Sequence, residues 1–443
     1  MQRYTACMPS FNTTPVRFNF LFLLLSVSLF TVRANAQDNR PYTRYGLGEL
    51  QPQMPSGLRA WGFQSAADQD PYRFNPVNPA SLGSLASSVL QLGVFGNATW
   101  LKANDSIDRF GSGSVDYVML GVPVIRNKWG MAAGLLPYAR TNYSVIQLNE
   151  ETTGIPRSVN RSSGRGALYE AYLATGWQFG GFSFGVKGAY AFGNMDQTSV
   201  LVFDDTLNGF NSRFNAERAF SGFTWNGGVQ YQLPLATRDR IQFGASARLS
   251  QTITARRNFV YERFLYNANN AEVPFDTIDI GQGERGDVTL PAQYDAGIIF
   301  KRFATDKRDV VRWQAGLNFT YTAHEDYRSF GESDSLHSTF RLAGGVEWTP
   351  RDEAIEGYHN RVRYRAGSYY GTGALQLRNQ AFNRYGVTFG LGLPVRRVFS
   401  YIDVSVDYGV HGPSDKTLLR EQYLNGTVGF SFSDRWFIKR RYD

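Results

Sequence analysis

The sequence predicts an all-β fold: a fourteen-stranded antiparallel β-barrel that crosses a membrane, with an N-terminal segment plugging its lumen. Three observations predict it: apolar and polar side chains alternate along many segments, these segments are long, and long connections alternate with short ones. In residues 401–408, apolar side chains at even positions alternate with Asp403, Ser405 and Asp407, so an extended chain would have one apolar and one polar face. A soluble antiparallel sandwich shows the same alternation, so lengths and connections must decide between the two.

The expected strands are fourteen in number and lie between residues 88 and 432. They are Ser88 to Ala103, Ser114 to Val124, Trp129 to Leu148, Gly164 to Phe179, Phe182 to Val202, Arg218 to Leu233, Arg240 to Ala255, Asp287 to Phe300, Val311 to Tyr327, Leu336 to Trp348, Asn360 to Tyr370, Phe382 to Leu393, Phe399 to Tyr408 and Glu421 to Phe432. Nearly all reach the roughly 9 to 11 residues that a tilted strand needs to cross a bilayer, about twice the length of a usual soluble strand.

The connections between these strands differ in length by their parity. Odd-numbered connections are mostly long, at 104–113, 149–163, 203–217, 256–286, 328–335, 371–381 and 409–420, and even-numbered ones are mostly short, at 125–128, 180–181, 234–239, 301–310, 349–359 and 394–398. Outer-membrane barrels have short turns at the periplasmic rim and long loops at the other rim, whereas a sandwich has no reason to obey such a rule. The parity therefore favours a membrane barrel.

The composition agrees with a barrel in a membrane. Of 443 residues, 15% are aromatic, 19% are charged and 45 are glycine, which is more aromatic and glycine-rich than an average soluble domain. No internal run of about 20 apolar residues exists, so helical membrane spans are excluded. Aromatic side chains near expected strand ends would suit the girdles at the two membrane surfaces, as at Trp129, Trp177, Trp313, Trp348 and Tyr408.

Residues 1–36 are expected to form a signal peptide. Arg3 and Arg17 precede an apolar run from Phe18 to Val32, and the small residues of Ala34-Asn35-Ala36 supply a cleavage site. The only cysteine, Cys7, would be lost with this segment, leaving neither a disulfide nor a thiol nucleophile. The formal charge of +8 would fall to +5, and the basic residues are scattered, so a nucleic-acid partner is not expected. The export route leads to the outer membrane of a Gram-negative bacterium.

Residues 37–87 differ from everything that follows them. They are rich in Pro, Gly, Asn and Gln and lack the alternation, and their prolines forbid a regular strand interior. A flexible linker is the alternative, but Trp61, Phe63, Tyr72 and Phe74 make the segment too apolar for one. We therefore expect a compact plug, followed by a barrel at 88–432 and a basic, aromatic tail at 433–443.

Three short motifs carry a resemblance to a known family. They are Ala66-Ala67-Asp68 leading to Asn75-Pro76-Val77-Asn78-Pro79-Ala80-Ser81-Leu82, then Glu347-Trp348-Thr349-Pro350 with Tyr364-Arg365-Ala366-Gly367-Ser368-Tyr369-Tyr370, and the ending from Val428 to Arg440. They resemble the FadL-like family of outer-membrane channels for hydrophobic compounds, in its Bacteroidota form. The resemblance implies a hatch that carries the motif residues Asp68, Asn75, Pro76, Asn78, Pro79 and Ala80. The doubled Asn-Pro and the basic tail depart from the family pattern.

The resemblance also implies a ligand site near the hatch and a lateral exit through a kink in the third strand. Five apolar hatch residues could line a pocket for an acyl chain, namely Leu58, Trp61, Phe63, Phe74 and Leu82. The alternative is that they pack the plug against the barrel wall. Pro137 lies in the third expected strand and lacks an N–H for the ladder, so it marks either a lateral opening or a simple bulge.

Two sequence patterns typical of enzymes occur, but the secondary structure expected around them does not suit either motif. Gly181 to Gly185 fits a nucleophile elbow literally but lies within an alternating strand, without the helix that the motif needs. Gly281 to Gly286 fits a dinucleotide-binding pattern but lies in an expected long loop with no helix after it. The four histidines show no metal-ligand spacing. We therefore expect no enzyme activity, no cofactor and no metal site.

Two functions remain open from the sequence. The first is a channel for passive uptake of hydrophobic or amphipathic molecules resembling long-chain fatty acids, in contact with outer-membrane lipid and lipopolysaccharide. The second is a non-transporting barrel subunit of an outer-membrane protein assembly or surface-protein secretion complex, as Bacteroidota use barrels of this type. The long loop at 256–286 and the tail motivate the second. Side chains of the tail would contact either the membrane rim or a partner protein, and they are Trp436, Phe437, Lys439, Arg440 and Arg441.

Overall fold

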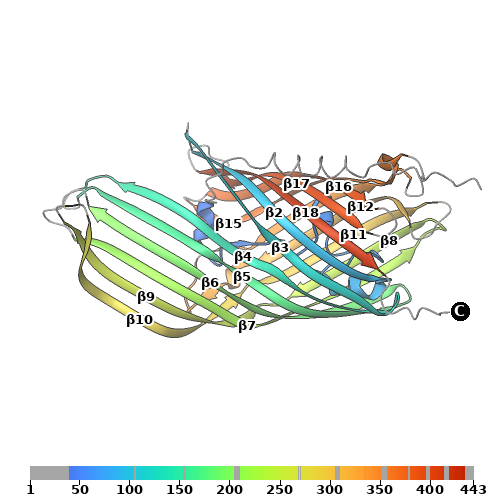
Figure 1. Ribbon diagram of the computed structural model, residues 1–443, viewed down its shortest axis with the longest axis horizontal. Coiled ribbons are helices and arrows are strands. Elements are labelled where there is room, and N and C mark those ends of the chain that lie inside the picture. Colours follow the sequence, from blue (N-terminus) through green and yellow to red (C-terminus); the bar gives the residue numbers. More distant parts are fainter. Residues whose placement is uncertain are drawn as a thin grey trace, which may run out of the picture.

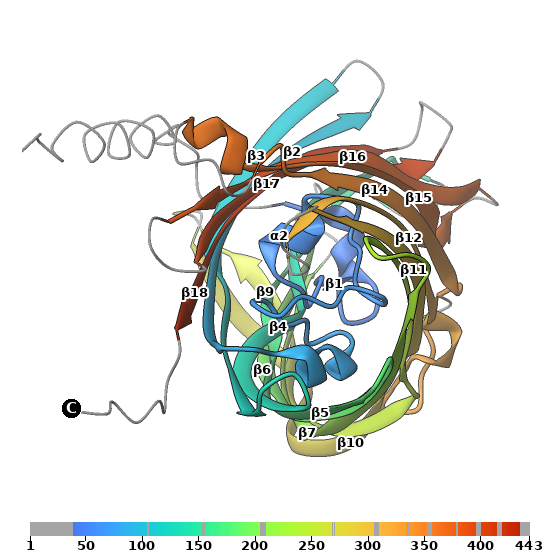
Figure 2. The ribbon, with the colours of Figure 1, turned by 90° about the vertical axis from the view of Figure 1, so that its right-hand side faces the viewer.

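The protein is a closed barrel of antiparallel strands (Figures 1 and 2). The computed structural model describes residues 39–103, 106–152, 156–203, 210–267, 269, 271–304, 310–334, 336–351, 357–377, 380–395, 400–413 and 419–434. Consecutive wall strands pair with one another, and β18 (Arg420–Asp434) pairs with β2 (Ser88–Ala103) to close the ring. The wall has the fourteen strands that the sequence predicts. The short strands β1 (Glu49–Leu50) and β13 (Arg328–Ser329) are added to it, and two wall strands are each broken in two.

The remaining elements follow in chain order (Figure 1). The strands are β3 (Ser106–Ile125), β4 (Trp129–Asn149), β5 (Ser158–Phe179), β6 (Phe182–Phe203), β7 (Asn211–Pro234), β8 (Asp239–Arg248), β9 (Gln251–Tyr266), β10 (Glu272–Leu290), β11 (Ala292–Phe303), β12 (Val311–Ala323), β14 (Thr339–Trp348), β15 (Arg363–Leu377), β16 (Gln380–Pro394) and β17 (Tyr401–Pro413). The helical turns are η1 (Pro41–Arg44), α2 (Ser56–Arg59), η2 (Pro79–Ser84), η3 (His324–Asp326) and η4 (Tyr358–Arg361). Among the residues described, no helix is long and apolar enough to cross a membrane.

Several predicted long loops are wrong, because the structure has strands there. Part of 149–163 and part of 203–217 extend β4 to β7, and 256–286 is not a loop but most of the hairpin of β9 and β10. These stretches meet water on both faces, so they lack the alternation that marks a membrane-crossing strand. Their backbone groups are satisfied by the neighbouring strands all the same.

One side of the barrel rises far above the membrane belt. On β6 the outward side chains from Phe182 to Phe192 are apolar, but Asn194, Asp196 and Thr198 follow them on the same face. The other long strands change in the same way. We name this part the extension sheet: residues 138–149, 158–168, 193–203, 211–222, 251–266 and 272–290 (Figure 1, left). The strands opposite it, such as β12 with 13 residues and β14 with 10, are just long enough to cross.

Residues 39–87, which we name the hatch segment, lie inside the ring of strands (Figure 2). They pack on the inner wall in three apolar clusters, one of which joins Leu47 to wall residues of β4 to β7, β9 and β10. Trp61 and Leu58 contact a cluster with Ile299 and Ala343 of the wall, whereas Phe74 belongs to a second cluster with wall residues of β3 to β6. The hatch segment therefore brings its own apolar side chains to a lumen whose wall is mostly polar.

Candidate functional site: hatch, cavity and seam

The hatch segment approaches the wall so closely that the wall needs glycine. A β-carbon built on Gly345 would overlap the carbonyl oxygen of Trp61, one on Gly244 would overlap that of Ala66, and one on Gly228 would overlap the Asn78 side chain. Glycine weakens a strand interior, so it is kept where another backbone comes close. The hatch segment is thus in close contact with the barrel wall at several separate positions.

The hatch motif lies within this fitted region. The Asn78 amide donates to the carbonyls of Ala66 at 2.6 Å, Val229 at 3.2 Å and Ala245 at 3.2 Å, while its oxygen accepts from the N–H of Ala80 and caps η2. Pro79 occupies the first position of η2, where its missing N–H costs nothing. The doubled Asn-Pro therefore has a structural role: it turns the hatch segment and attaches it to β7 and β8.

The other motif residues lie beside it and are buried. The Asn75 amide donates to the carbonyl of Ser65 at 2.6 Å, and Pro76 follows it in the turn that precedes η2. Asp68 accepts from Arg73 at 3.1 Å within the hatch segment. The structure thus brings the six residues of the sequence motif together.

Ion pairs cross from the hatch segment to the wall. Arg59 pairs with Asp116 of β3 at 2.8 Å, and Asp70 pairs with Arg363 of β15 at 3.3 Å. Burial alone would raise the pKa of Asp70, but the charges of Arg363 and Arg73 outweigh it and lower that pKa. These pairs attach the hatch segment to two well-separated strands of the wall.

A buried cluster of charges fixes the middle of the lumen. Glu170 of β5 pairs with Lys187 of β6 at 3.2 Å and with Arg248 of β8 at 3.5 Å. Gln53 of the hatch segment joins it, because its amide donates to Glu170 at 2.9 Å and its oxygen accepts from Lys187 at 3.2 Å. Buried ion pairs add little net stability, but removing one partner is costly, so such a cluster favours a single arrangement.

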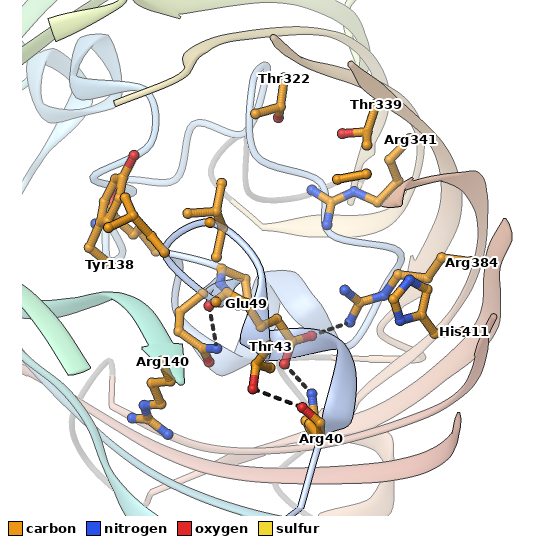
Figure 3. Close-up of a pocket in the computed structure, with 18 of the residues that line it drawn as sticks. Arg40, Thr43, Glu49, Tyr138, Arg140, Thr322, Thr339, Arg341, Arg384 and His411 are labelled. Atoms are coloured by element: carbon orange, nitrogen blue, oxygen red, sulfur yellow. Dashed lines mark hydrogen bonds and ion pairs between the residues drawn. The ribbon is translucent and has the colours of Figure 1, made fainter. Parts of the chain in front are cut away.

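A cavity of about 540 Å³ lies above this cluster, at the end of the lumen where the long connections are (Figure 3). The Arg341, Arg384 and His411 side chains enter it from the wall. Glu49 of β1 pairs with Arg384 at 3.0 Å and also with Arg40. Burial alone would raise the pKa of Glu49, but Arg40 and Arg384 outweigh it and lower the pKa to about 2. Charged residues line this cavity: Arg40, Glu49, Arg59, Arg140, Arg165, Arg248, Asp295, Arg341, Arg384, Asp407 and Glu421.

The wall has a seam between β3 and β4. The two strands pair only from Val118 with Leu135 to Ile125 with Trp129. Beyond Leu135, β3 pairs with β2 and β4 pairs with β5, and the β2–β3 hairpin leans away from β4 (Figures 1 and 2). The closed ring of strands is therefore complete only at the end with the short turns.

The start of the hatch segment fills the seam from inside. β1 pairs with Ala139 and Arg140 of β4. Further along, the N–H of Arg40 donates to the carbonyl of Asn142 at 2.9 Å, and the Asn39 amide exchanges two hydrogen bonds with the backbone of Ser144, both of 2.8 Å. Residues 39–51 thus cover the edge that β3 has left, through β1 and through the hydrogen bonds of Asn39 and Arg40.

Comparisons with known proteins place this architecture in a family. The model of the BamG family matches residues 19–443, which is nearly the whole chain. The chain belongs to the BamG family. No curated protein matches the sequence.

Solved structures share the fold of this BamG-family chain. The toluene transporter TodX of Pseudomonas putida is 14% identical with a TM-score of 0.56, and the match covers 87% of this chain and 100% of TodX. The toluene transporter TbuX of Ralstonia pickettii is 13% identical with a TM-score of 0.52, covering 86% and 98%. A FadL homologue of Pseudomonas aeruginosa is 12% identical with a TM-score of 0.53, covering 87% and 98%. At such identities the likeness shows the fold alone, and these neighbours are channels rather than enzymes.

The five predicted pocket residues are all buried in this BamG-family chain, but only Phe63 lines the cavity. Leu58 and Trp61 pack against the wall, and so do Phe74 and Leu82. A pocket formed by all five stays a prediction. The charged lining of the cavity is not among the sequence predictions, although Asp295, Arg341 and Arg384 occupy inward positions of alternating strands, a signal that could have found them.

Pro137 lies at a bulge in the pairing of β4 with β5, between Pro137 and Ala139. That pairing continues to Asn149, so the wall is closed on this side, and the seam lies on the other side of β4. A lateral opening at Pro137 stays a prediction. The tail residues Trp436 to Arg441 and the expected signal peptide lie outside the described residues.

The chance enzyme patterns are parts of the barrel. Gly181 to Gly185 lies at a turn and the start of β6, and Gly281 to Gly286 lies in β10 rather than in the predicted loop. Within the part of the chain that the structure describes, no group of three or more histidine, cysteine, aspartate or glutamate side chains is placed to hold a metal ion.

Proposed function

We propose that the protein is a plugged, non-transporting barrel that serves as a subunit of an outer-membrane protein complex, for assembly or for surface-protein secretion. The observation that carries this proposal is the fit of the hatch segment to glycines of the wall, as at Gly345 and Gly244. A plug that moved during transport would separate surfaces that leave no room for a single β-carbon. It would also break the ion pairs of Arg59 and Asp70 with the wall.

The cavity supports the same proposal. Sites for hydrophobic ligands are mostly apolar with a few polar groups. This cavity has apolar side chains such as Phe63 and Leu336, but charged groups also face it, with Arg341 and Arg384 on its wall and Glu49 on its inner side. Burying an acyl chain against such groups would desolvate charges without replacing their hydrogen bonds.

Depletion of the protein in its native cells tests this role. A subunit's loss should lower the abundance of other outer-membrane or surface-exposed proteins, measured by quantitative mass spectrometry of the isolated membrane. If depletion leaves that protein content unchanged and only slows the uptake of a hydrophobic compound, the subunit role is wrong.

A passive channel for hydrophobic or amphipathic molecules, such as long-chain fatty acids, is the second candidate. The seam between β3 and β4 favours it, because a gap in the wall beside a cavity of about 540 Å³ offers a lateral route into the membrane. The shared fold with the toluene transporters TodX and TbuX supports it as well. Lipid and lipopolysaccharide would then surround the exit. Residues 39–51 would have to leave the edge of β4 before anything passed.

A further inference from the structure

Among the described residues, the last five residues of β4 have no strand partner on the side away from β5. The backbone groups of Asn142 and Ser144 point away from β5 and bond to the hatch segment. Backbone direction alternates with a period of two, so the N–H and C=O of Ile146 and Leu148 point the same way. No described residue pairs with this side of Val145 to Asn149, because β3 has left at Leu135 and the bonds of the hatch segment end at Ser144.

An aliphatic patch lies beside this edge on the outer face of the extension sheet. Ile146 and Leu148 are 65% and 57% exposed. Leu148 pairs with Val159 of β5, which in turn pairs with Val202 of β6. Val200 lies two residues before Val202 on the same face of β6. We name Ile146, Leu148, Val159, Val200 and Val202 the aliphatic patch. It is contiguous across β4, β5 and β6.

Membrane lipid does not account for this patch. The apolar belt on β6 ends at Phe192, and the outward side chains Asp196 and Thr198 separate it from Val200. At about 3.3 Å per residue and a tilt of about 40°, Val200 lies roughly 20 Å above the belt. The headgroup layer adds only about 5–8 Å on each side of the hydrocarbon core. The patch is therefore exposed beyond the headgroups, where an apolar surface marks a contact with another protein.

The two edges of the extension sheet are built differently. β10, at the far edge, carries register shifts at Pro274/Asp276 and Thr277/Asp279 and is partly covered by β13. Bulges, prolines and charges are the usual protection of an edge against strand addition. The free part of β4 has no register shift and no charged residue, and the same edge already pairs with β1 and accepts hydrogen bonds from Arg40 and Asn39.

We infer that Val145 to Asn149 of β4 receives an extended strand of a partner protein, whose apolar side chains cover Ile146 and Leu148. Main-chain bonds give such a complex its affinity, and alternate side chains give it specificity. This assignment rests on the proposed subunit role and names the place where that subunit docks.

Photo-cross-linking in intact native cells tests the assignment. A photoreactive amino acid replaces Ile146 in one full-length variant and Leu148 in another, and the adducts are mapped by mass spectrometry. Both positions should reach one partner segment, at sites two residues apart, as strand pairing requires. Combined with the probe at 148, Ile146→Pro should lower the adduct about tenfold, since it removes an edge N–H that β5 does not use. Ile146→Val should leave the adduct unchanged.

A probe at Asp196 is the matched control, because Asp196 lies on the outer face of β6, nearer the membrane than the aliphatic patch and outside it. It should give no such adduct. Heat-dependent gel migration checks that each variant forms a barrel. Adducts to lipid or lipopolysaccharide, to scattered sites, or to residues of this chain before Asn39 would overturn the assignment. If partners co-purify with the protein while neither probe reaches them, this docking site is wrong and the subunit role stands. If no partner is found by either method, both are wrong.

Discussion

The carbonyl oxygen of Trp61 lies directly against Gly345 of β14, where a β-carbon would overlap it. Trp61 is fully buried, so the contact joins the hatch segment to the wall in the interior of the lumen. Similar contacts at Gly244 and Gly228 repeat this fit around the wall. The hatch segment therefore behaves as part of the folded core, and separating it from the barrel should cost stability.

Gly345→Ala should loosen the hatch segment. The added methyl group forces the Trp61 backbone away, and overpacking of this kind costs about 1–3 kcal/mol. We expect a lower thermal unfolding midpoint and a higher ion conductance in planar bilayers. Gly188→Ala is the matched control, because nothing lies within 4 Å of the β-carbon position at Gly188 on β6. Equal midpoints for the two variants would show that the fit at Gly345 is unimportant.

Arg59→Met should destabilise the protein by about 3–5 kcal/mol, because it leaves Asp116 buried without its cation. In the double variant with Asp116→Leu, part of the loss should return, since no unpaired charge remains. The quantity to measure is the coupling energy of the double-mutant cycle from denaturant unfolding. A coupling energy of zero would mean that the pair does not attach the hatch segment to β3.

Acid should release the start of the hatch segment. The pKa of Glu49 is about 2 in the folded protein against an ordinary value of 4.5, so its contribution is fully present above pH 4.5 and is lost as the pH falls towards 2. Hydrogen exchange of residues 39–51 should therefore be constant above pH 4.5, after correction for intrinsic rates, and accelerate below it. Glu49→Gln should remove this acceleration. An unchanged acid response in that variant would assign it to another group.

Asn39→Leu should weaken the attachment of the hatch segment at the seam. It removes both hydrogen bonds between the Asn39 amide and the Ser144 backbone. Two such bonds are worth roughly 1–3 kcal/mol, so the Ser144 amide should exchange about tenfold faster or more. Gln147→Leu is the control, because Gln147 bonds only to Asn149 among the described residues. No change at Ser144 would mean that Asn39 does not close the seam.

The sequence predicts the barrel well because lipid imposes a rule on each crossing strand. Alternation and connection parity gave the strand number, and both come from the contrast between lipid and lumen. The extension sheet has water on both sides, so the sequence of 256–286 carries no such contrast and predicts a loop instead of a hairpin. Pro137 lies at a bulge beside β5, but the strand that separates from β4 is β3, and no local pattern around Pro137 indicates which neighbour separates. Contacts such as Arg384 with Glu49 join residues 335 positions apart in the chain, and no local pattern encodes them.

The most direct test of the subunit role is gentle extraction of the tagged protein from its own outer membrane, followed by a salt wash and mass spectrometry of everything that remains bound. A plugged subunit should retain one or more proteins in fixed stoichiometry, because its docking contacts are apolar and main-chain rather than purely ionic. A lone barrel that carries a bound acyl compound would contradict the subunit role and favour the channel.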